Sequence, residues 1–314
     1  MERPAVLVIT ETGDLSTDLV VLELQKRGIS FLRLNQDQAV PTGQLTWDLD
    51  DSGYKLTVSG HDAPLPDGVW YRRPFRPRPP QNETDQYMKR QESAFLEGIW
   101  RSLGASNWVN RPQAVEHASN KLVQLAAASR SGLTIPTSRV TSSLSEARGF
   151  VEQGSRVVAK PVSGGAFSYG GQRSMVFTSE VGEEELRKDD AITGCPVVLQ
   201  RLVAGEDVRV TVVDHELFAT RIDIEDRSPA ETDWRVVPEE RLSYSPIDIA
   251  GPLAACIDRT MGTLDLTFGA IDFVVDADGE YHFLEVNPAG QWGWIEAATD
   301  IPVTSRIVDK LLTS

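Results

Sequence analysis

The sequence near the end of the chain restricts most strongly what this protein can fold into. Two apolar, strand-like segments flank the turn sequence Asp276-Ala-Asp-Gly279, a pattern that predicts a β-hairpin. Glu285 and Asn287 lie two residues apart on the second strand, so both side chains leave the same face. If the hairpin closes with a four-residue loop, Asp272 lies opposite Glu285 and projects from that face as well. The hairpin therefore predicts a patch of two carboxylates and one amide.

This patch offers only oxygen ligands, without a histidine or cysteine among them. Oxygen ligands suit Mg²⁺, which keeps several of its waters and bridges to the phosphates of a substrate. The patch thus predicts a magnesium site beside a nucleotide. Acidic residues near a hairpin are also commonly solvated surface, and the neighbouring segments decide between the two interpretations.

Length, charge and cysteine content limit the class of protein. A chain of 314 residues exceeds the size at which single cores usually stop growing, so we expect two or three subdomains. The net charge of −15 disfavours nucleic acid and anionic membranes as main partners. Cys195 and Cys256 are too few for a disulfide framework, and no apolar run approaches the roughly 20 residues of a transmembrane helix. We therefore expect a cytoplasmic protein.

The first third of the chain has the pattern of a Rossmann-like sheet. Strands over 5–9 and 31–34 flank a helix over 17–27, which predicts a βαβ unit. No G-x-G-x-x-G sequence follows the first strand, so this unit names no dinucleotide. A later strand ends in Arg72 and Arg73, which suit a carboxylate or phosphate group, although a solvated pair beside the proline-rich loop is an equal alternative.

Helical patterns recur along the chain, over residues 83–103, 114–131, 248–264 and 303–312. The helix over 114–131 carries Lys121, which without further context would be an ordinary exposed lysine. The charge-dense stretch from Asp223 to Tyr244 predicts a partly ordered connection.

A lysine and a glycine-rich loop follow in the middle of the chain. A predicted strand ends in Lys160, and the loop after it contains Gly164 and Gly165. Such glycines allow backbone amides to close over phosphate oxygens; a surface loop without a ligand is the alternative. The Walker A pattern is absent from the whole sequence, which disfavours a P-loop NTPase.

Another hairpin is predicted about the turn Asp214-His215-Glu216, with strands over 208–213 and 217–224. Arg209 and Arg221 then face one site across this hairpin. Arginines buried in strands need partners, so structural ion pairing is the competing account.

Taken in order, these segments resemble an ATP-grasp ligase from about residue 112 to the end. The segments are Asn120-Lys121, Val158-Ala-Lys160-Pro161, the glycine loop, Val198-Leu-Gln200, Glu206-Asp207-Val-Arg209, Asp272 and Glu285-Val-Asn287. Within that superfamily the chain resembles the microviridin-type ribosomal-peptide maturases, also called graspetide synthetases. The segments that carry this second resemblance are Trp70-Tyr-Arg-Arg-Pro74, Trp108-Val-Asn110, Asp233-Trp-Arg235 and Asn287-Pro-Ala-Gly-Gln-Trp292.

The resemblance implies an α/β (α+β) ATP-grasp fold in three parts. These parts are an N-terminal Rossmann-like domain over 1–112, a central lid domain over 113–196 and a C-terminal domain over 197–314, with ATP between the last two. Such enzymes phosphorylate an Asp or Glu side chain of a precursor peptide, which consists of a leader and a core. A Ser, Thr or Lys side chain then attacks the acylphosphate and closes a macrocyclic ester or amide. Homodimers are common among the resembled enzymes, so a homodimer is one assembly open to the chain.

The resemblance also implies ligands and roles for single residues. ATP would be bound by the side chains of Lys121 and Lys160, by the backbone of Gln200, Arg201 and Leu202, and by Asp207 or Glu206. Many ligases of this superfamily have an acidic residue where this chain has Gln200. Because the backbone largely recognises adenine there, the change casts little doubt on the assignment.

Metal ions and substrate would be held further along the site. Asp272, Glu285 and Asn287 would hold Mg²⁺, Arg221 or alternatively Arg209 would stabilise the acylphosphate, Arg72 or Arg73 would grip the acceptor, and Asp233 and Arg235 would recognise the core peptide. Two other functions stay open from the sequence: a ligase that adds free amino acids to a protein or peptide, and a nucleotide-sensing protein without turnover.

Overall fold

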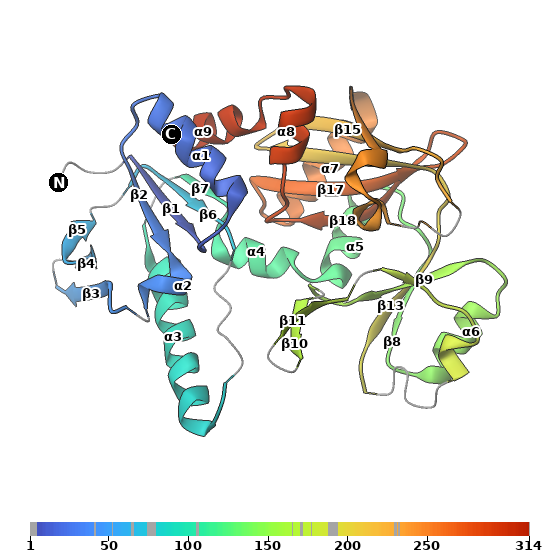
Figure 1. The fold of residues 1–314 in the computed structure, drawn as a ribbon, viewed down its shortest axis with the longest axis horizontal. Coiled ribbons are helices and arrows are strands. Elements are labelled where there is room, and N and C mark those ends of the chain that lie inside the picture. The colour runs from blue at the N-terminus through green and yellow to red at the C-terminus, as the bar shows by residue number, and fades with distance from the viewer. Residues whose placement is uncertain are drawn as a thin grey trace.

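A parallel sheet with the strand order β2-β1-β6-β7 forms one side of the computed structural model, drawn in blue and cyan in Figure 1. The structure describes residues 5–313 except positions 41, 52, 64–65, 74–79, 105–106, 165, 170–171, 177, 188–193, 229–230 and 232. A small antiparallel sheet, β3-β4-β5, is inserted between β2 and β6. The bounds in this part are β1 (Val6–Thr10), α1 (Leu15–Lys26), β2 (Phe31–Asn35), α2 (Gln36–Ala39), β3 (Leu45–Asp50), β4 (Gly53–Val58), β5 (His61–Ala63), β6 (Gly68–Tyr71), α3 (Glu83–Ser102) and β7 (Asn107–Val109).

A second unit lies at the lower right of Figure 1 and is built on the antiparallel sheet β12-β9-β13-β8. The hairpin β10–β11 projects from it toward the middle of the molecule. The bounds from the preceding helices onward are α4 (Pro112–Ala118), α5 (Lys121–Arg130), β8 (Ser138–Thr141), α6 (Leu144–Val151), β9 (Val157–Pro161), β10 (Ala166–Tyr169), β11 (Gln172–Met175), β12 (Ser179–Glu180), η1 (Glu185–Arg187) and β13 (Val197–Arg201).

The last third of the chain forms an antiparallel sheet in the order β16-β15-β14-β17-β18. Helix α9 returns to the N-terminal sheet and lies beside α1 and β7. The bounds are β14 (Glu206–Val213), β15 (Glu216–Ile224), η2 (Trp234–Val236), η3 (Glu239–Arg241), β16 (Leu242–Ile247), α7 (Gly251–Thr263), β17 (Phe268–Val275), β18 (Tyr281–Asn287), α8 (Gly293–Thr299) and α9 (Val303–Leu312).

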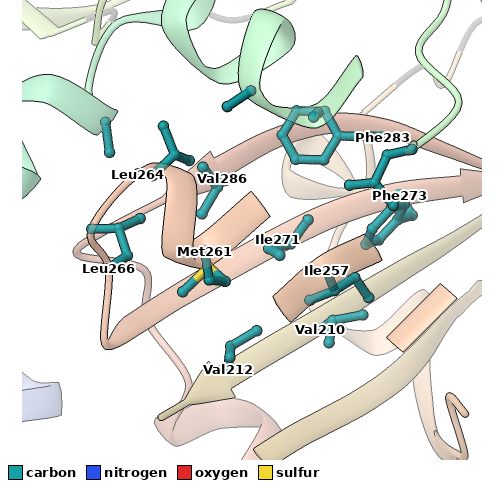
Figure 2. Close-up of a cluster of buried hydrophobic side chains, with 14 of the residues drawn as sticks. Val210, Val212, Ile257, Met261, Leu264, Leu266, Ile271, Phe273, Phe283 and Val286 are labelled. Carbon is teal, nitrogen blue, oxygen red and sulfur yellow. The ribbon is translucent and has the colours of Figure 1, made fainter. Parts of the chain in front are cut away.

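One face of this C-terminal sheet carries the main apolar core (Figure 2). Val210 of β14 and Ile271 of β17 share this cluster with Ile257 and Met261 of α7. Burying one such side chain fully stabilises the fold by roughly 1.5–3 kcal/mol. Because alternate residues of a strand point to opposite faces, the residues between them, such as Arg209, lie on the other face. Polar side chains therefore lie on the face of this sheet that points away from the apolar core.

A second cluster joins the N-terminal sheet to the end of the chain. The rings of Trp70, Phe268 and Trp292 meet edge to face, with centroids 5.6, 5.7 and 5.3 Å apart. Ile307 and Leu311 of α9 are fully buried in the same cluster. The parallel sheet and the C-terminal sheet are therefore packed on each other through large side chains.

The fold class expected from the sequence is confirmed, whereas the domain limits at residues 112 and 196 stay a prediction. The single helix expected over 114–131 is wrong, because the chain forms two helices there. Asn120 caps the start of the second one, and its side chain accepts a hydrogen bond from the amide of Leu122 at 2.9 Å. Asparagine favours such caps over a place inside a helix. Among the described residues, no helix combines the length and apolar character needed to cross a membrane.

Two glycines give opposite predictions for stability. A Cβ atom on Gly68 would lie 2.1 Å from the carbonyl oxygen of Leu311, whereas Gly98 in α3 has open space around it. We expect Gly68→Ala to lower the free energy of unfolding by about 1–3 kcal/mol, because α9 has to move away from β6. Gly98→Ala should raise it by about 0.5–1 kcal/mol through helix propensity. Urea denaturation of both variants checks this, and equal effects would contradict the close approach.

Candidate active site

The opposed carboxylates predicted at the hairpin are present, because Asp272 of β17 pairs with Glu285 of β18. The turn alone does not produce this pairing. Nearer the turn Phe273 pairs with Phe283, a register that would place Leu284 opposite Asp272. A β-bulge between Asp272 and Phe273 shifts the register by one residue. Since a one-residue shift exchanges the two faces of a strand, the bulge puts both carboxylates on the same face.

Asp272 is buried and bound by a forked guanidinium. Arg209 lies directly opposite it on β14, and its Nε and Nη2 atoms donate to Oδ1 and Oδ2 at 2.8 and 3.0 Å. Two parallel charge-assisted hydrogen bonds fix orientation as well as distance. The guanidinium also lies 5.2 Å from the ring centre of Trp234. Arg209 therefore holds Asp272 rigidly in place.

A second guanidinium, that of Arg235, bridges the two carboxylates. Its Nη2 donates to Oδ2 of Asp272 and, at 3.3 Å, to Oε1 of Glu285. Its Nη1 donates to Asp233 at 3.1 Å, while the Asp233 side chain also caps the backbone amide of Arg235. Burial lowers the pKa of Arg235, but these carboxylates outweigh it and raise the pKa, so the side chain stays charged.

Lys121 binds Glu285 from the other side. It is the first residue of α5, and its ammonium donates to Oε2 of Glu285. Burial raises the pKa of Glu285, yet Lys121 and Arg235 together bring the pKa below its usual range. Glu285 is thus ionised, and the two carboxyl groups are surrounded by three cations, Arg209, Arg235 and Lys121.

Lys160 faces this cluster from the other sheet. It lies near the end of β9, is 8% exposed, and donates to Oε1 of Gln200 at 2.7 Å. Gln200 on β13 is itself oriented by Ser138, whose hydroxyl accepts from its Nε2 at 3.0 Å. Burial lowers the pKa of Lys160 to about 8; Glu285 opposes this effect, and Lys121 adds to it. The lysine is consequently a poorly compensated cation that a bound anion would stabilise.

A cavity of about 320 Å³ lies between the two sheets, with β9 and β13 on one side and β14, β17 and β18 on the other. Nine residues predicted for the site line it: Lys160, Gln200, Arg201, Leu202, Asp207, Asp233, Arg235, Asp272 and Glu285. The sequence analysis missed Arg227, Glu231 and Trp234, which also line it. These three lie in the stretch from Asp223 to Tyr244, of which the sequence analysis assigned only Asp233 and Arg235 to the site. The high density of charged residues in this stretch was the sequence signal that could have identified them.

Asp207 lies in this cavity in a largely dry position. Burial raises the pKa of its carboxyl group to about 6, although Arg227 acts in the opposite direction. The Nη1 atom of Arg227 is 2.8 Å from Oδ2 of Asp207, but it donates its aligned hydrogen bond to the carbonyl oxygen of Gly205 at 3.0 Å. Oδ2 of Asp207 has no aligned protein donor. The carboxylate is therefore incompletely satisfied and can accept a donor from a ligand.

Arg221 does not lie with Arg209, and the expectation that both face one site is wrong. The sequence suggested a turn of three residues, 214–216, but Glu216 pairs with Val213, so the turn contains only 214–215. The register therefore changes by one and places Thr220 opposite Arg209. Arg221 lies on the opposite face of the sheet, where it pairs with Asp223 at 3.1 Å. The structure thus brings Arg209, not Arg221, to the carboxylates.

The remaining predicted residues lie around the cavity or away from it. Arg72 follows β6 and is buried in an ion pair with Asp14, whereas the neighbouring Arg73 is partly exposed. Glu206 is exposed and does not line the cavity. Gly164 lies on an exposed loop, and the expectation for Gly165 falls outside the described residues.

The oxygen atoms of Asp272, Glu285 and Asn287 fit a hard cation such as Mg²⁺. Asn287 is two residues beyond Glu285 on β18, is exposed, and pairs with Ala270 at the end of the hairpin. Among the described histidine, cysteine and acidic side chains, no group of three or more could hold a metal. The amide oxygen of Asn287 is therefore needed to complete a three-residue ligand set.

A lysine-bearing sheet that faces a carboxylate-bearing sheet across a cavity is the arrangement that the resemblance to ATP-grasp ligases implies. Residues 5–116 match the family model described as the MvdD pre-ATP grasp domain. The RiPP-associated ATP-grasp ligase of Chryseobacterium gregarium, solved with ADP and a leader and core peptide, is 26% identical, with a TM-score of 0.83 over 98% of this chain and 96% of that chain.

Two further proteins extend this comparison. Macrocyclase MdnC of Microcystis aeruginosa, solved with precursor peptide MdnA, is 26% identical, with a TM-score of 0.83 over 98% of this chain and 99% of that chain. The tetrahydromethanopterin:alpha-L-glutamate ligase of Methanocaldococcus jannaschii is 21% identical over 212 residues, which are 65% of this chain and 69% of that protein. Over nearly its whole length the chain is therefore similar to peptide-modifying ATP-grasp ligases, and the resemblance found in its sequence is confirmed.

The raised pKa of Asp207 gives a testable dependence of stability on pH. Between its ordinary pKa of 3.8 and about 6, the folded protein keeps a proton that the unfolded chain releases, so stability falls as pH rises through this range. Asp207→Asn removes this loss. We expect its stability relative to wild type to improve by about 1 kcal/mol between pH 5 and pH 7 and to change little above pH 7. Urea denaturation at several pH values measures the difference, and a constant difference would refute the assignment.

Proposed function

We propose that this ligase uses ATP and Mg²⁺ to phosphorylate Asp or Glu side chains of a ribosomally made precursor peptide and joins them to hydroxyl or amino side chains of the same peptide. One observation carries the proposal: Lys160 faces the acidic pair Asp272 and Glu285 across one cavity. Over nearly its full length the chain also matches a ligase solved with ADP, leader and core peptide.

The chemistry requires such a concentration of charge. A carboxylate is a poor electrophile, and its oxygen is a poor leaving group until phosphoryl transfer converts it. Phosphoryl transfer depends on in-line positioning and on neutralising the charge that spreads over the phosphoryl oxygens. Lysines, arginines and Mg²⁺ would supply that neutralisation.

The positions of several residues support the proposed ATP-binding roles. Lys160 and Lys121 would hold phosphate oxygens, with help from the backbone near Gly164 and Gly165. The backbone from Gln200 to Leu202 would meet the adenine, since these residues line the cavity at the end of β13. Asp207 is a better ribose partner than Glu206, because it lies in the cavity with an oxygen free of aligned donors.

The metal and substrate roles follow from the ion pairs. Asp272, Glu285 and Asn287 would coordinate Mg²⁺, which would neutralise charge between ATP phosphates. Arg209 would keep Asp272 oriented. Arg235 holds the same oxygen atoms that a metal ion would take. Its guanidinium is therefore available to a substrate carboxylate only once a cation replaces it, which supports a role for Asp233 and Arg235 in receiving the core peptide.

A ligase that adds free amino acids is the second candidate, because one relative is a glutamate ligase. The two reactions differ in the mass of the product. Ring closure within a peptide removes one water for each bond, whereas addition of an amino acid increases the mass.

Intact mass spectrometry separates these functions. The precursor candidate is a short acidic peptide encoded beside the gene, incubated with the protein, Mg²⁺ and ATP. We expect loss of one or more waters with a matching amount of ADP, and no change with Glu285→Ala, which removes a metal ligand. Glu225→Ala is the matched control, since Glu225 follows β15 and does not line the cavity. A gain in mass would favour the amino-acid ligase, and ADP formation that persists in Glu285→Ala would contradict the site.

The lowered pKa of Lys160 predicts how nucleotide binding depends on pH. Its pKa of about 8 lies below the ordinary 10.5, so the side chain loses its charge as pH rises through 8, and phosphate binding favours the charged form. We expect the dissociation constant of ADP to increase about five- to tenfold between pH 7 and pH 9. Lys160→Arg should bind ADP with little dependence on pH, because arginine stays charged. Calorimetric titration at both pH values is the measurement, and an equal dependence in both proteins would exclude Lys160 as its source.

A further inference from the structure

The loop Pro288–Gly290 directly follows Asn287, the last residue of β18 and the third member of the oxygen ligand set. The loop turns back on that residue. The amide of Ala289 donates to the side-chain oxygen of Asn287 at 3.0 Å, and the amide of Gly290 donates to its carbonyl oxygen at 3.1 Å. The position of the Asn287 amide group therefore depends on where this loop lies.

Two side chains of the N-terminal sheet hold the loop from outside. Arg72 comes directly after β6, and its Nη1 donates to the carbonyl oxygen of Gly290 at 2.7 Å. Asn110 comes directly after β7, and its Nδ2 donates to the carbonyl oxygen of Pro288 at 3.2 Å. Because β6 and β7 are parallel neighbours, their carboxyl ends deliver both donors to the same edge. The loop is thus bound at its first and last residues.

Both donors are themselves fixed. The side-chain oxygen of Asn110 accepts from the amides of Thr267 and Phe268 at 2.7 and 2.8 Å, and its Nδ2 also donates to the Phe268 carbonyl at 2.8 Å. Arg72 is 2% exposed, and its Nε donates to Asp14 at 2.9 Å. Neither side chain can turn toward another partner without losing buried hydrogen bonds.

Burying the ion pair of Arg72 and Asp14 carries a large desolvation penalty. A buried ion pair is often no more stabilising than apolar residues of the same volume, because both ions lose their hydration. Its distinctive property is geometry: the planar guanidinium fixes Asp14 on one side and the Gly290 carbonyl on the other. On the inner side, a Cβ atom on Gly290 would lie 2.3 Å from the Cβ of Ala270, so the loop is also pressed against β17.

We propose that Arg72 and Asn110 are positioning residues that set the metal affinity of the site through the loop Pro288–Gly290. This inference rests on the metal site of the proposed function. It assigns Arg72 to the support of the Asn287 ligand and leaves Arg73 as the exposed arginine of the pair. Outer groups that orient a metal ligand typically change metal affinity by about 10- to 100-fold when they are removed.

The test measures metal affinity without any peptide. The variants are Arg72→Lys, which replaces the fork by a single ammonium, and Asn110→Ser, which removes the donor to Pro288. Thr17→Val is the matched control: Thr17 donates to Asp14 at 2.7 Å and accepts from Trp70 at 3.0 Å, and neither of these hydrogen bonds goes to the loop. The probe is Mn²⁺ with ADP, and electron paramagnetic resonance counts the free metal ion.

We expect Arg72→Lys and Asn110→Ser each to weaken Mn²⁺ binding about tenfold. Thr17→Val should change it less than twofold even though its thermal unfolding midpoint falls. Hydrogen exchange of the Gly290 amide should accelerate in the first two variants and not in the control. Should Arg72→Lys not fold, Asn110→Ser carries the test alone.

The inference is overturned by Mn²⁺ affinity that is unchanged in both variants, or by an equal loss in Thr17→Val, which would mean a general effect of stability. Absence of Mn²⁺ binding by the wild type would overturn the metal site together with the inference. Failure of the peptide reaction alone would leave this result intact, because ADP and Mn²⁺ bind without peptide.

Discussion

The placement of Asp272 beside Glu285 is the constraint on which the rest of the site depends. Two carboxylates on adjacent strands repel each other, and removing them from water adds a desolvation penalty. Cations from three separate elements compensate them: Arg209 from β14, Lys121 from α5 and Arg235 from η2. A change that moves any of these elements therefore changes the charge balance of the site.

The C-terminal sheet can carry this charge because its two faces are chemically separate. The face toward α7 carries the apolar cluster around Ile257 and Met261 (Figure 2). The opposite face bears Asp207, Arg209 and Asp272 at alternate or opposed positions. A close-packed core on one side limits how far the strands can shift on the other. Apolar packing on one face of the sheet therefore helps to fix the positions of the proposed metal-binding side chains on the other face.

The sequence predicted much of this arrangement, and its failures have one physical origin. The strand pattern and the turn near residue 276 correctly paired Asp272 with Glu285, but the bulge that achieves the pairing leaves no mark in a pattern of alternating residues. The same sensitivity to register made the prediction for Arg221 wrong. One residue fewer in the turn at Asp214 reverses the face of every later residue on β15. Periodicity finds strands, whereas tertiary packing decides register.

Contacts between segments that lie far apart in the sequence were the other limit on what could be predicted. The sequence singled out Arg72 for its neighbour Arg73 and the prolines after them, yet its partners are Asp14 and the carbonyl of Gly290, 218 residues away along the chain. Arg235, in contrast, was proposed through the resemblance of the segment Asp233-Trp-Arg235 to a family motif, and in the structure Asp233 caps the short helix that presents it. Residues whose function depends on a cap or a hairpin can be inferred from neighbours in sequence.

The free energy of the site also limits the order in which it can be filled. Arg235 neutralises the carboxylates in the free protein, so a divalent cation gains only the difference between its own coordination and the ion pairs that it replaces. This exchange would weaken metal binding in the absence of substrate. A substrate carboxylate that accepts the released guanidinium restores the lost interaction, so metal and substrate would each favour the binding of the other. Coupling of this kind follows from one cation shared between two anionic partners, and it requires no movement of the sheet that carries Asp272 and Glu285.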